Sequence, residues 1–298
     1  MGKAHSVSSN LFKAFGLCLL AYFLALLAAV IAGRALNYLH PILTAFWADI
    51  AATLVIYIFS RVSGNSSFYD PYWSLAPMAI VIFWSFAVLP AVGIGIRQMI
   101  VIILVFIWGL RLTLNWSSQW QGLGHEDWRY SEYRKRYGGW FWLIDLIGIE
   151  LMPTAIVFLG CLSLYPALAS GNAPWGIMDI PAVLVTLGAI VIETTADEQM
   201  KKFSREPHPT GQIMQRGLWA YSRHPNYFGE IMFWWGLYLF VLAANPHFWW
   251  TVIGPLVITL LFLTVSIPLM DKRSLVRRPG YAEHMKKVSV LIPWLPGK

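Results

Sequence analysis

Long apolar stretches, separated by short polar or turn-forming breaks, follow one another along almost the whole chain of 298 residues. Stretches of the length that crosses a bilayer as a helix cover residues 13–33, 42–60, 71–89, 98–116, 146–166, 179–197, 227–244 and 248–270. They are continuous rather than alternating, which predicts helices and not the strands of a membrane barrel. The pattern therefore predicts an all-α, polytopic membrane protein with about eight transmembrane helices.

Composition strengthens this prediction. Hydrophobic residues make up 57% of the chain and charged residues only 12%, whereas a soluble domain carries about 25% charged residues. This excludes a soluble globular protein, a disordered chain and a nucleic-acid-binding module. No internal repeat or low-complexity tract divides the sequence. We therefore expect a single integral membrane domain over 1–298, with N-terminal helices in 1–60 and a helical core that holds the functional site in 61–298.

The positive charges predict an orientation for these helices. If the N-terminus is cytoplasmic, all but two of the 22 Lys and Arg residues fall in cytoplasmic segments, and only Arg34 and Arg97 lie outside. Such a bias is typical of the cytoplasmic side of membrane proteins. We expect both termini in the cytoplasm, together with three longer polar segments at 117–145, 198–226 and 271–298.

Polar side chains gather at the cytoplasmic ends of five predicted spans. They are Asp70, Arg111 with Asn115, Glu193 with Asp197, Asn226 with Glu230, and Asp271 with Arg273. Ionisable residues are costly in membrane spans and usually mark function, and residues four apart share one helix face. The pattern predicts a polar pocket open to the cytosol, and the basic segments around it favour a polyanionic ligand. Asp49, alone in its span, is interpreted as a buried, hydrogen-bonded acid without a chemical role.

The sequence predicts no metal site. Cys18 and Cys161 both lie in apolar segments and give neither zinc spacing nor a disulfide framework. The histidines lack the short spacings of a membrane di-iron enzyme, and they are His5, His40, His125, His208, His224, His247 and His284.

Residues 217–230 read Gly-Leu-Trp-Ala-Tyr-Ser-Arg-His-Pro-Asn-Tyr-Phe-Gly-Glu. This stretch resembles the signature of the DUF1295 family, which is related to the C-terminal domain of the steroid 5-alpha-reductases. Segments that resemble further motifs of that family are 68–74, 108–112, 197–203, 277–284 and 292–293. The resemblance covers roughly residues 60–298.

The relatives are multi-helix membrane reductases that bind NADPH from the cytoplasmic side and transfer hydride to the β-carbon of an enone in a lipid. The resemblance therefore implies NADPH as the cofactor and a steroid-like or other hydrophobic lipid as the substrate. The residues that it implies at the cofactor are Arg111, Asn115, Asp197, Arg223, His224, Asn226, Tyr227, Glu230, Arg278 and Tyr281.

One position departs from the pattern. In the steroid reductases a tyrosine stands three residues before the arginine that matches Arg111, and here that position is Trp108, whose indole is a poor proton source. Reduction of a conjugated carbonyl needs a group that stabilises the developing enolate oxygen. Asp70, if burial keeps it protonated, or Tyr69 or Tyr72 beside it, are the candidates. The predicted catalytic set is thus Asp70, Tyr69, Tyr72 and Trp108.

Two other functions remain open. The stretch around Arg223 and Tyr227 also resembles the isoprenylcysteine and phospholipid methyltransferases, which use S-adenosylmethionine, and a third possibility is a non-catalytic lipid-binding membrane protein. Asn226 and the segment at Asp197 favour the reductase. Expected partners are the lipid substrate and membrane lipids, with no nucleic acid and no metal, and the oligomeric state is not predicted. A bacterial inner membrane or an endoplasmic reticulum fits, with the site facing the cytoplasm.

Overall fold

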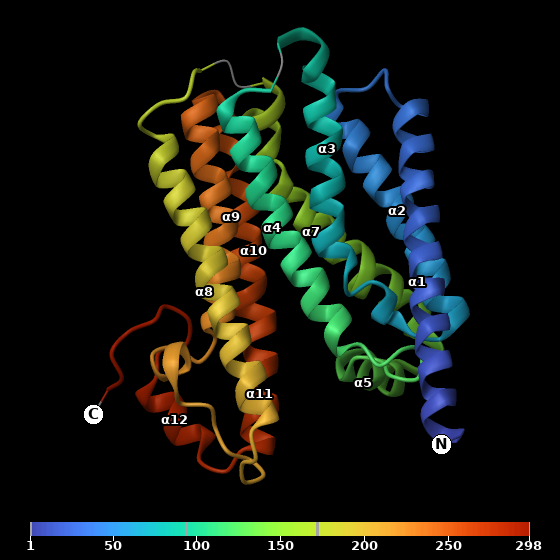
Figure 1. Ribbon diagram of the computed structural model, residues 1–298, viewed down its shortest axis with the longest axis vertical. Coiled ribbons are helices and arrows are strands. Elements are labelled where there is room, and N and C mark those ends of the chain that lie inside the picture. Colours follow the sequence, from blue (N-terminus) through green and yellow to red (C-terminus); the bar gives the residue numbers. More distant parts are fainter. Residues whose placement is uncertain (1, 93, 171–172, 298) are drawn as a thin grey trace. The chain divides into compact units, whose positions relative to one another are not determined.

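The computed structural model describes the backbone of residues 2–92, 94–170 and 173–297, and the side chains of 11–86, 94–170 and 173–297. In these ranges the regular structure is helical, and an isolated bridge joins Ser222 to Ser289. The α-helices are α1 (Gly2–Ala35), α2 (Pro41–Ser63), α3 (Tyr72–Val92), α4 (Ile96–Gln119), α5 (Trp128–Tyr137), α6 (Phe141–Ile144), α7 (Met152–Cys161), α8 (Asp179–Arg205), α9 (Pro225–Ala244), α10 (Ile253–Leu261), α11 (Ile267–Arg277) and α12 (Tyr281–Lys287) (Figure 1). Short 3-10 turns are η1 (Ser66–Phe68), η2 (Gly138–Trp140), η5 (Gly217–Ala220) and η6 (Pro246–Val252), and π-helical segments are η3 (Asp145–Leu151), η4 (Pro166–Ser170) and η7 (Phe262–Ser266).

Within the described residues, seven helical stretches are long and apolar enough to cross a bilayer. They are Leu11–Ala35, Pro41–Ser63, Ile96–Gln119, Trp128–Ser170, Asp179–Arg205, Pro225–Ala244 and Pro246–Arg277. The predicted span at 71–89 coincides with helix α3, and its residues 87–89 lie outside the described side chains. The all-α, polytopic prediction is confirmed, and the chain is an integral, multi-pass membrane protein. The side on which the termini lie stays a prediction.

The fourth stretch, Trp128–Ser170, is much longer than the predicted span at 146–166. It begins at Trp128 because the polar segment Trp128–Tyr137 is itself helical, with Asp127 as its N-cap. The Asp127 carboxylate accepts a hydrogen bond from the backbone N–H of Arg129 at 2.8 Å, which satisfies one of the free donors of the first turn. The charged helix α5 thus continues directly into the apolar part of this stretch.

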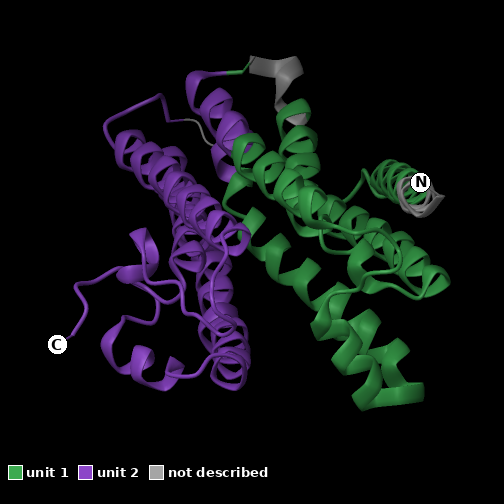
Figure 2. Ribbon diagram, turned by 60° about the horizontal axis from the view of Figure 1, so that its bottom comes forward, with its two compact units in different colours: residues 1–94, 105–165 green, residues 95–104, 166–298 purple. Residues whose placement is uncertain are grey.

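Two compact units make up the chain, and each is described by itself (Figure 2). Unit 1 comprises residues 1–94 and 105–165, and unit 2 comprises 95–104 and 166–298. The boundaries between the units fall after residues 94, 104 and 165. The prediction of one integral membrane domain, with N-terminal helices in 1–60 and a helical core in 61–298, stays a prediction.

Small side chains hold α1 against α2 in unit 1. Ala14, Cys18, Ala21 and Ala25 recur every three or four residues, so that they share one face of α1, and all four are buried in a cluster with Ile56 of α2. Small residues let two membrane helices approach closely enough for extensive van der Waals contact.

In unit 2, α8 and α9 pack closely in antiparallel directions because α9 carries glycines at the contact. A Cβ atom at Gly229 would lie 2.7 Å from the Cβ of Glu193, and one at Gly236 would collide with Thr186. These two contacts fix the register of the pair. One turn further toward the end of α8, Asp197 therefore comes level with the first turn of α9, where Asn226 lies.

A buried ion pair fixes the start of α8 in the same unit. The Arg97 Nε donates to Asp179 Oδ1 at 2.6 Å and its Nη2 donates to Oδ2 at 2.8 Å, which is the bidentate geometry of the strongest side-chain pairs. The remaining guanidinium hydrogens reach the carbonyls of Ala173, Pro174 and Ala243. Each of the three guanidinium nitrogens therefore has at least one hydrogen-bond acceptor.

Candidate functional site

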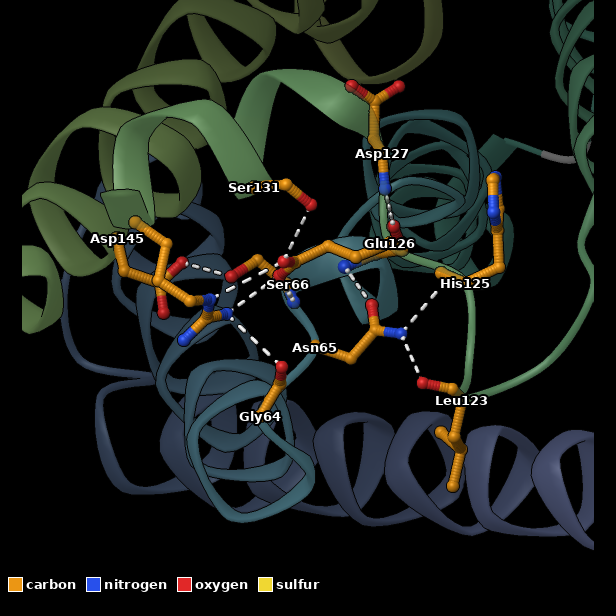
Figure 3. Close-up of polar contacts among 11 residues, drawn as sticks. Gly64, Asn65, Ser66, Leu123, His125, Glu126, Asp127, Ser131 and Asp145 are labelled. Carbon is orange, nitrogen blue, oxygen red and sulfur yellow. Dashed lines mark hydrogen bonds and ion pairs between the residues drawn. The ribbon is translucent and has the colours of Figure 1, made fainter. Parts of the chain in front are cut away.

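A polar clasp in unit 1 holds the loop that carries Tyr69 and Asp70 (Figure 3). The clasp is built from the loop 64–67 and the loop 123–127. Asn65 caps η1 and donates from its amide nitrogen to the carbonyls of Leu123 and His125, both at 3.0 Å. Because the clasp joins two loops far apart in sequence, it fixes the backbone directly before the predicted catalytic residues.

Charged side chains complete the clasp. The Glu126 carboxylate accepts from the backbone N–H of Ser66 at 3.0 Å and from the guanidinium of Arg134 at 2.7 Å. The Ser66 hydroxyl donates to Asp145 at 2.6 Å, so that helix η3 is tied to the same loop. None of the clasp residues was predicted as functional, although Asp127 ahead of a basic segment is a recognisable helix-start signal.

Asp70 is half-buried and accepts a hydrogen bond from the Tyr130 hydroxyl at 2.7 Å. Burial raises the pKa of Asp70 from 3.8 to about 6, while the Tyr130 hydrogen bond and the nearby Arg129 charge oppose the rise. The direction agrees with the role that the sequence suggested, because a carboxyl group with a raised pKa retains its proton more easily.

The hydroxyls of Tyr69 and Tyr72 point into one buried polar cluster. Tyr72 donates to Asp49 Oδ1 at 2.6 Å, and Tyr69 lies 2.8 Å from the Thr154 hydroxyl, which in turn lies 2.9 Å from that of Thr53. The two rings stack with centroids 5.3 Å apart. Burial raises the pKa of Tyr69 well above its ordinary value, so its hydroxyl keeps its proton. Asp49 is buried and hydrogen-bonded, as predicted.

Trp108, Arg111 and Asn115 lie on the part of α4 that belongs to unit 1. Trp108 is fully buried and packs edge-on against Trp73, with ring centroids 6.1 Å apart. The neighbouring Gly109 makes this possible, because a Cβ there would lie 2.8 Å from the Ser74 carbonyl oxygen. Arg111 and Asn115 are half-buried, and the Asn115 side-chain oxygen accepts from Gln119 at 3.0 Å.

The other predicted cofactor residues lie in unit 2, where buried polar groups gather around the N-terminal end of α9. Glu230 is buried and accepts from the Trp234 indole at 2.8 Å. Glu193 of α8 is buried against Gly229. The side-chain oxygen of Asn226 is buried and has no hydrogen-bond partner among the described residues.

Three of the predicted residues converge on one carboxylate, that of Asp271 in α11. Arg223 donates to Oδ2 at 2.7 Å, and Tyr281 donates to Oδ1 at 2.7 Å. His224 Nε2 lies 3.0 Å from the same Oδ1, and since a carboxylate only accepts, Nε2 carries the hydrogen. Asp271 was noted at the end of its span but was left out of the predicted site. It is the residue that holds α9, α11 and α12 together there.

Arg223 and Tyr281 have further features at this junction. The Nε of Arg223 is buried without a hydrogen-bond partner in the described part of the chain. Burial and the hydrogen bond to Asp271 raise the pKa of Tyr281 to about 12, so this hydroxyl is a hydrogen-bond donor and not an acid. Tyr227 stacks on His224 with an interplanar angle of 8°, and Arg278 is half-buried beside Ser274.

The signature stretch 217–230 owes its conformation to two neighbours. On one side, Gln199 of α8 accepts from the backbone N–H of Leu218, and the Trp219 indole donates to the Ala196 carbonyl, both at 2.9 Å. On the other side, the backbone of 289–294 runs alongside, where Arg223 N–H donates to the Ser289 carbonyl at 2.8 Å. The chain between α8 and α9 is therefore held on both sides.

A cavity of about 240 Å³ opens beside the end of α8 in unit 2. Its lining residues are Gln199, Lys202, Phe203, Glu206, Met214, Arg216 and Gly217. Glu206 pairs with Arg216 at 3.5 Å, and Lys202 adds a second positive charge. None of these residues was predicted to belong to the site. Among the described residues, no three His, Cys, Asp or Glu side chains come together as a set of metal ligands.

The structure thus divides the predicted residues between the units. Tyr69, Asp70, Tyr72, Trp108, Arg111 and Asn115 belong to unit 1, and Asp197, Arg223, His224, Asn226, Tyr227, Glu230, Arg278 and Tyr281 belong to unit 2. Within unit 2, Asp271 of α11 is contacted by Arg223 and His224, which directly precede α9, and by Tyr281 of α12. A single chamber formed by both sets stays a prediction.

The fold is that of an all-α, multi-pass membrane protein, and each unit contains buried polar side chains. A family model described as "Protein of unknown function (DUF1295)" matches residues 56–288, so the chain belongs to this family. The resemblance to DUF1295 is confirmed, and the further relationship to the steroid 5-alpha-reductases stays a prediction. The chain is also 27% identical over 255 residues to an uncharacterized protein of Schizosaccharomyces pombe, a match that covers 78% of this chain and 74% of the other. No solved structure matches.

Proposed function

We propose that the protein is a membrane-embedded reductase that uses NADPH to reduce a carbon–carbon double bond of a hydrophobic lipid. The observation that carries the proposal is the pair of buried, unpartnered atoms at the start of α9. Arg223 Nε is a donor and Asn226 Oδ1 is an acceptor, and neither is satisfied within the described residues. Buried polar groups are normally hydrogen-bonded, so such a pair is a reason to expect a ligand with both kinds of group.

The residues of unit 2 suit a nicotinamide dinucleotide. Arg223 and Arg278 are guanidinium groups of the type that binds phosphate, and Asn226 is an amide that pairs with hydroxyl or carboxamide groups. Lys202 and Arg216 add positive charge at the cavity beside α8. When bound, NADPH would supply the hydride.

The protein's own side chains would orient the ligand and hold a proton. Asp271 fixes the guanidinium of Arg223 from one side at 2.7 Å and leaves its Nε edge for an acceptor. In unit 1, Asp70 has a pKa of about 6, near the range in which a general acid works best. Tyr69 and Tyr72 are the neighbouring hydroxyl donors. Asp70, Tyr69 and Tyr72 are therefore the candidates for stabilising the enolate oxygen.

The test is mass spectrometry of the small molecules released from gently purified protein. We expect NADP(H). Release of S-adenosylmethionine or its demethylated product would instead establish the methyltransferase chemistry, and release of lipid alone would favour a binding protein.

A variant localises the site. Asn226→Ala removes the buried acceptor and should weaken dinucleotide binding by about tenfold, because the corresponding loss of about 1.4 kcal/mol lies within the cost of about 1–3 kcal/mol for a buried group left without its partner. The matched control is Asn37→Ala, because Asn37 is exposed in the turn after α1. Equal dinucleotide affinity in both variants would contradict this placement.

A further inference from the structure

Glu150 is an acid inside the membrane-spanning stretch Trp128–Ser170 of unit 1, and the proposed reductase site does not use it. Its side chain is fully buried, and neither carboxyl oxygen has a hydrogen-bond partner among the described residues. The Ser60 hydroxyl of α2 is close enough to interact with it, although no hydrogen bond of regular geometry joins the two groups. Intramembrane acids without a structural partner are functional candidates by default.

Among the described groups that interact with Glu150, none carries a positive charge. The titratable groups that face it are Tyr22 of α1, Tyr57 of α2, Tyr69 and, from its own helix, Asp145. In the described part of unit 1, the charged group among these is another acid. A carboxylate at this place would be buried, unpaired and next to a like charge, so the site accommodates the neutral, protonated acid.

The helix that carries Glu150 is π-helical from Asp145 to Leu151. Its i→i+5 hydrogen bonding brings residues five apart nearly above one another, whereas in an α-helix they would be separated by about 1.4 turns. Asp145 and Glu150 are five apart. Asp145 is tied by Ser66 to the polar clasp, and Arg134 and Arg61 act on it electrostatically (Figure 3). The π-helical segment thus places Asp145, which is hydrogen-bonded to Ser66, near Glu150, whose carboxyl has no such partner among the described residues.

In the direction away from Asp145, the next polar side chains after Glu150 are those of Thr154 and Tyr69. Thr154 is four residues further along the same continuous helix, so it lies on the face that Glu150 occupies. The Thr154 hydroxyl is 2.8 Å from the Tyr69 hydroxyl. No hydrogen bond to a described residue holds the Glu150 carboxyl in one orientation, which allows it to turn between Asp145 and Thr154.

We propose that Glu150 is the proton-storing group of an intramembrane relay that runs from Asp145 through Glu150 and Thr154 to Tyr69. The relay rests on the proposed function, because each transferred hydride requires one proton from the protein. Glu150 gives its proton to the Thr154 oxygen while Thr154 passes its own hydrogen to the Tyr69 oxygen, and in the same concerted step Tyr69 passes its hydrogen to the reduced substrate, so that no tyrosinate forms. The Glu150 carboxylate that remains takes a proton from Asp145, which is replenished from the cytosolic water.

Infrared spectroscopy of the purified protein in lipid nanodiscs tests the relay. We expect a carbonyl band from a protonated carboxyl group in the wild type, its loss in Glu150→Gln, and its retention in Glu132→Gln, where the acid is exposed on α5. In heavy water the band should shift as the proton exchanges. Asp145→Asn should slow that exchange by about 100-fold, the usual contribution of a positioned acid or base.

Two results would overturn the relay. One is a carboxyl spectrum that is identical in the wild type and in Glu150→Gln, and the other is exchange in Asp145→Asn at the wild-type rate. If Glu150→Gln does not fold, Glu150→Asp retains an acid and should move the band, and an unmoved band contradicts the assignment.

These measurements need no dinucleotide, so they separate the two proposals. An exchangeable Glu150 proton in a protein that releases no NADP(H) would refute the reductase and leave the proton site standing. Bound NADP(H) without the carboxyl band would refute the relay alone.

Discussion

Asp271 is the residue whose loss should disturb the unit 2 site most. The sharpest perturbation is Asp271→Asn, which preserves the size of the side chain and replaces one carboxylate oxygen with an NH2 group. Arg223, His224 and Tyr281 all donate to this carboxylate, at 2.7, 3.0 and 2.7 Å. Whichever way the amide turns, at least one donor meets another donor.

The magnitude follows from the burial of the pair. The side chains of Arg223 and Asp271 are only 8% and 10% exposed, so solvent screens their attraction weakly. A hydrogen bond to a charged group contributes about 1.5–3 kcal/mol, and breaking a buried ion pair costs about 3–5 kcal/mol. We expect Asp271→Asn to destabilise the protein by about 3 kcal/mol and, because Arg223 loses its orientation, to weaken NADPH binding by at least about tenfold.

Three measurements on the protein in detergent or nanodiscs check this expectation. They are the unfolding temperature, the NADPH dissociation constant and the pKa of Tyr281, which should fall from about 12 once its carboxylate partner is gone. The matched control is Glu283→Gln, because Glu283 pairs with Lys286 on the exposed surface of α12, where a pair contributes less than about 1 kcal/mol. Unchanged stability and affinity in Asp271→Asn would refute the role given to this junction.

Other expectations concern packing, charge and pH. Gly229→Ala should destabilise by about 1–3 kcal/mol in an unfolding titration, because the added methyl would lie within 3 Å of α8, whereas Gly188→Ala, with nothing within 4 Å, should be neutral or stabilising. Arg97→Ala should cost about 3–5 kcal/mol by leaving the Asp179 carboxylate buried and unpaired, and wild-type stability in that variant would show that the pair is dispensable. Because burial raises the pKa of Asp70 from 3.8 to about 6, its stabilising contribution is complete below pH 3.8 and is lost as the pH rises through about 6. Unfolding temperatures of the wild type and Asp70→Asn across this range should therefore differ in slope, and parallel curves would contradict the raised pKa.

The helical architecture could be predicted because the thickness of the bilayer fixes how long an apolar helix must be to cross it. The predicted spans overlap the helices, although α1 begins at Gly2 and α8 continues to Arg205, well outside the predicted 13–33 and 179–197. A further discrepancy is at Trp128–Tyr137. That segment is a helix of charged and aromatic residues capped by Asp127, and hydropathy does not detect such a helix. The signal in the sequence that indicates the start of this helix is Asp127, a preferred N-cap residue.

The candidate site could be predicted only in part. Helical spacing places Asn226 and Glu230 on one face, and the structure has both at the start of α9. The convergence of Arg223, His224 and Tyr281 on Asp271 could not be read from spacing, because it depends on how three helices meet. The same holds for Glu150, whose importance comes from its lack of a partner and from a π-helical segment, neither of which appears in a sequence.

The central claim is hydride transfer from NADPH to a lipid, and deuterium labelling tests it most directly. The wild-type protein is incubated with NADPH deuterated at the transferred position and with the lipid extract of its host membrane, and the lipids are analysed by mass spectrometry. The reductase predicts a lipid product that carries one carbon-bound deuterium from the cofactor and one hydrogen from water, and that disappears in Asn226→Ala. A lipid mass spectrum that shows no deuterated product and is the same for the wild type and Asn226→Ala would contradict it.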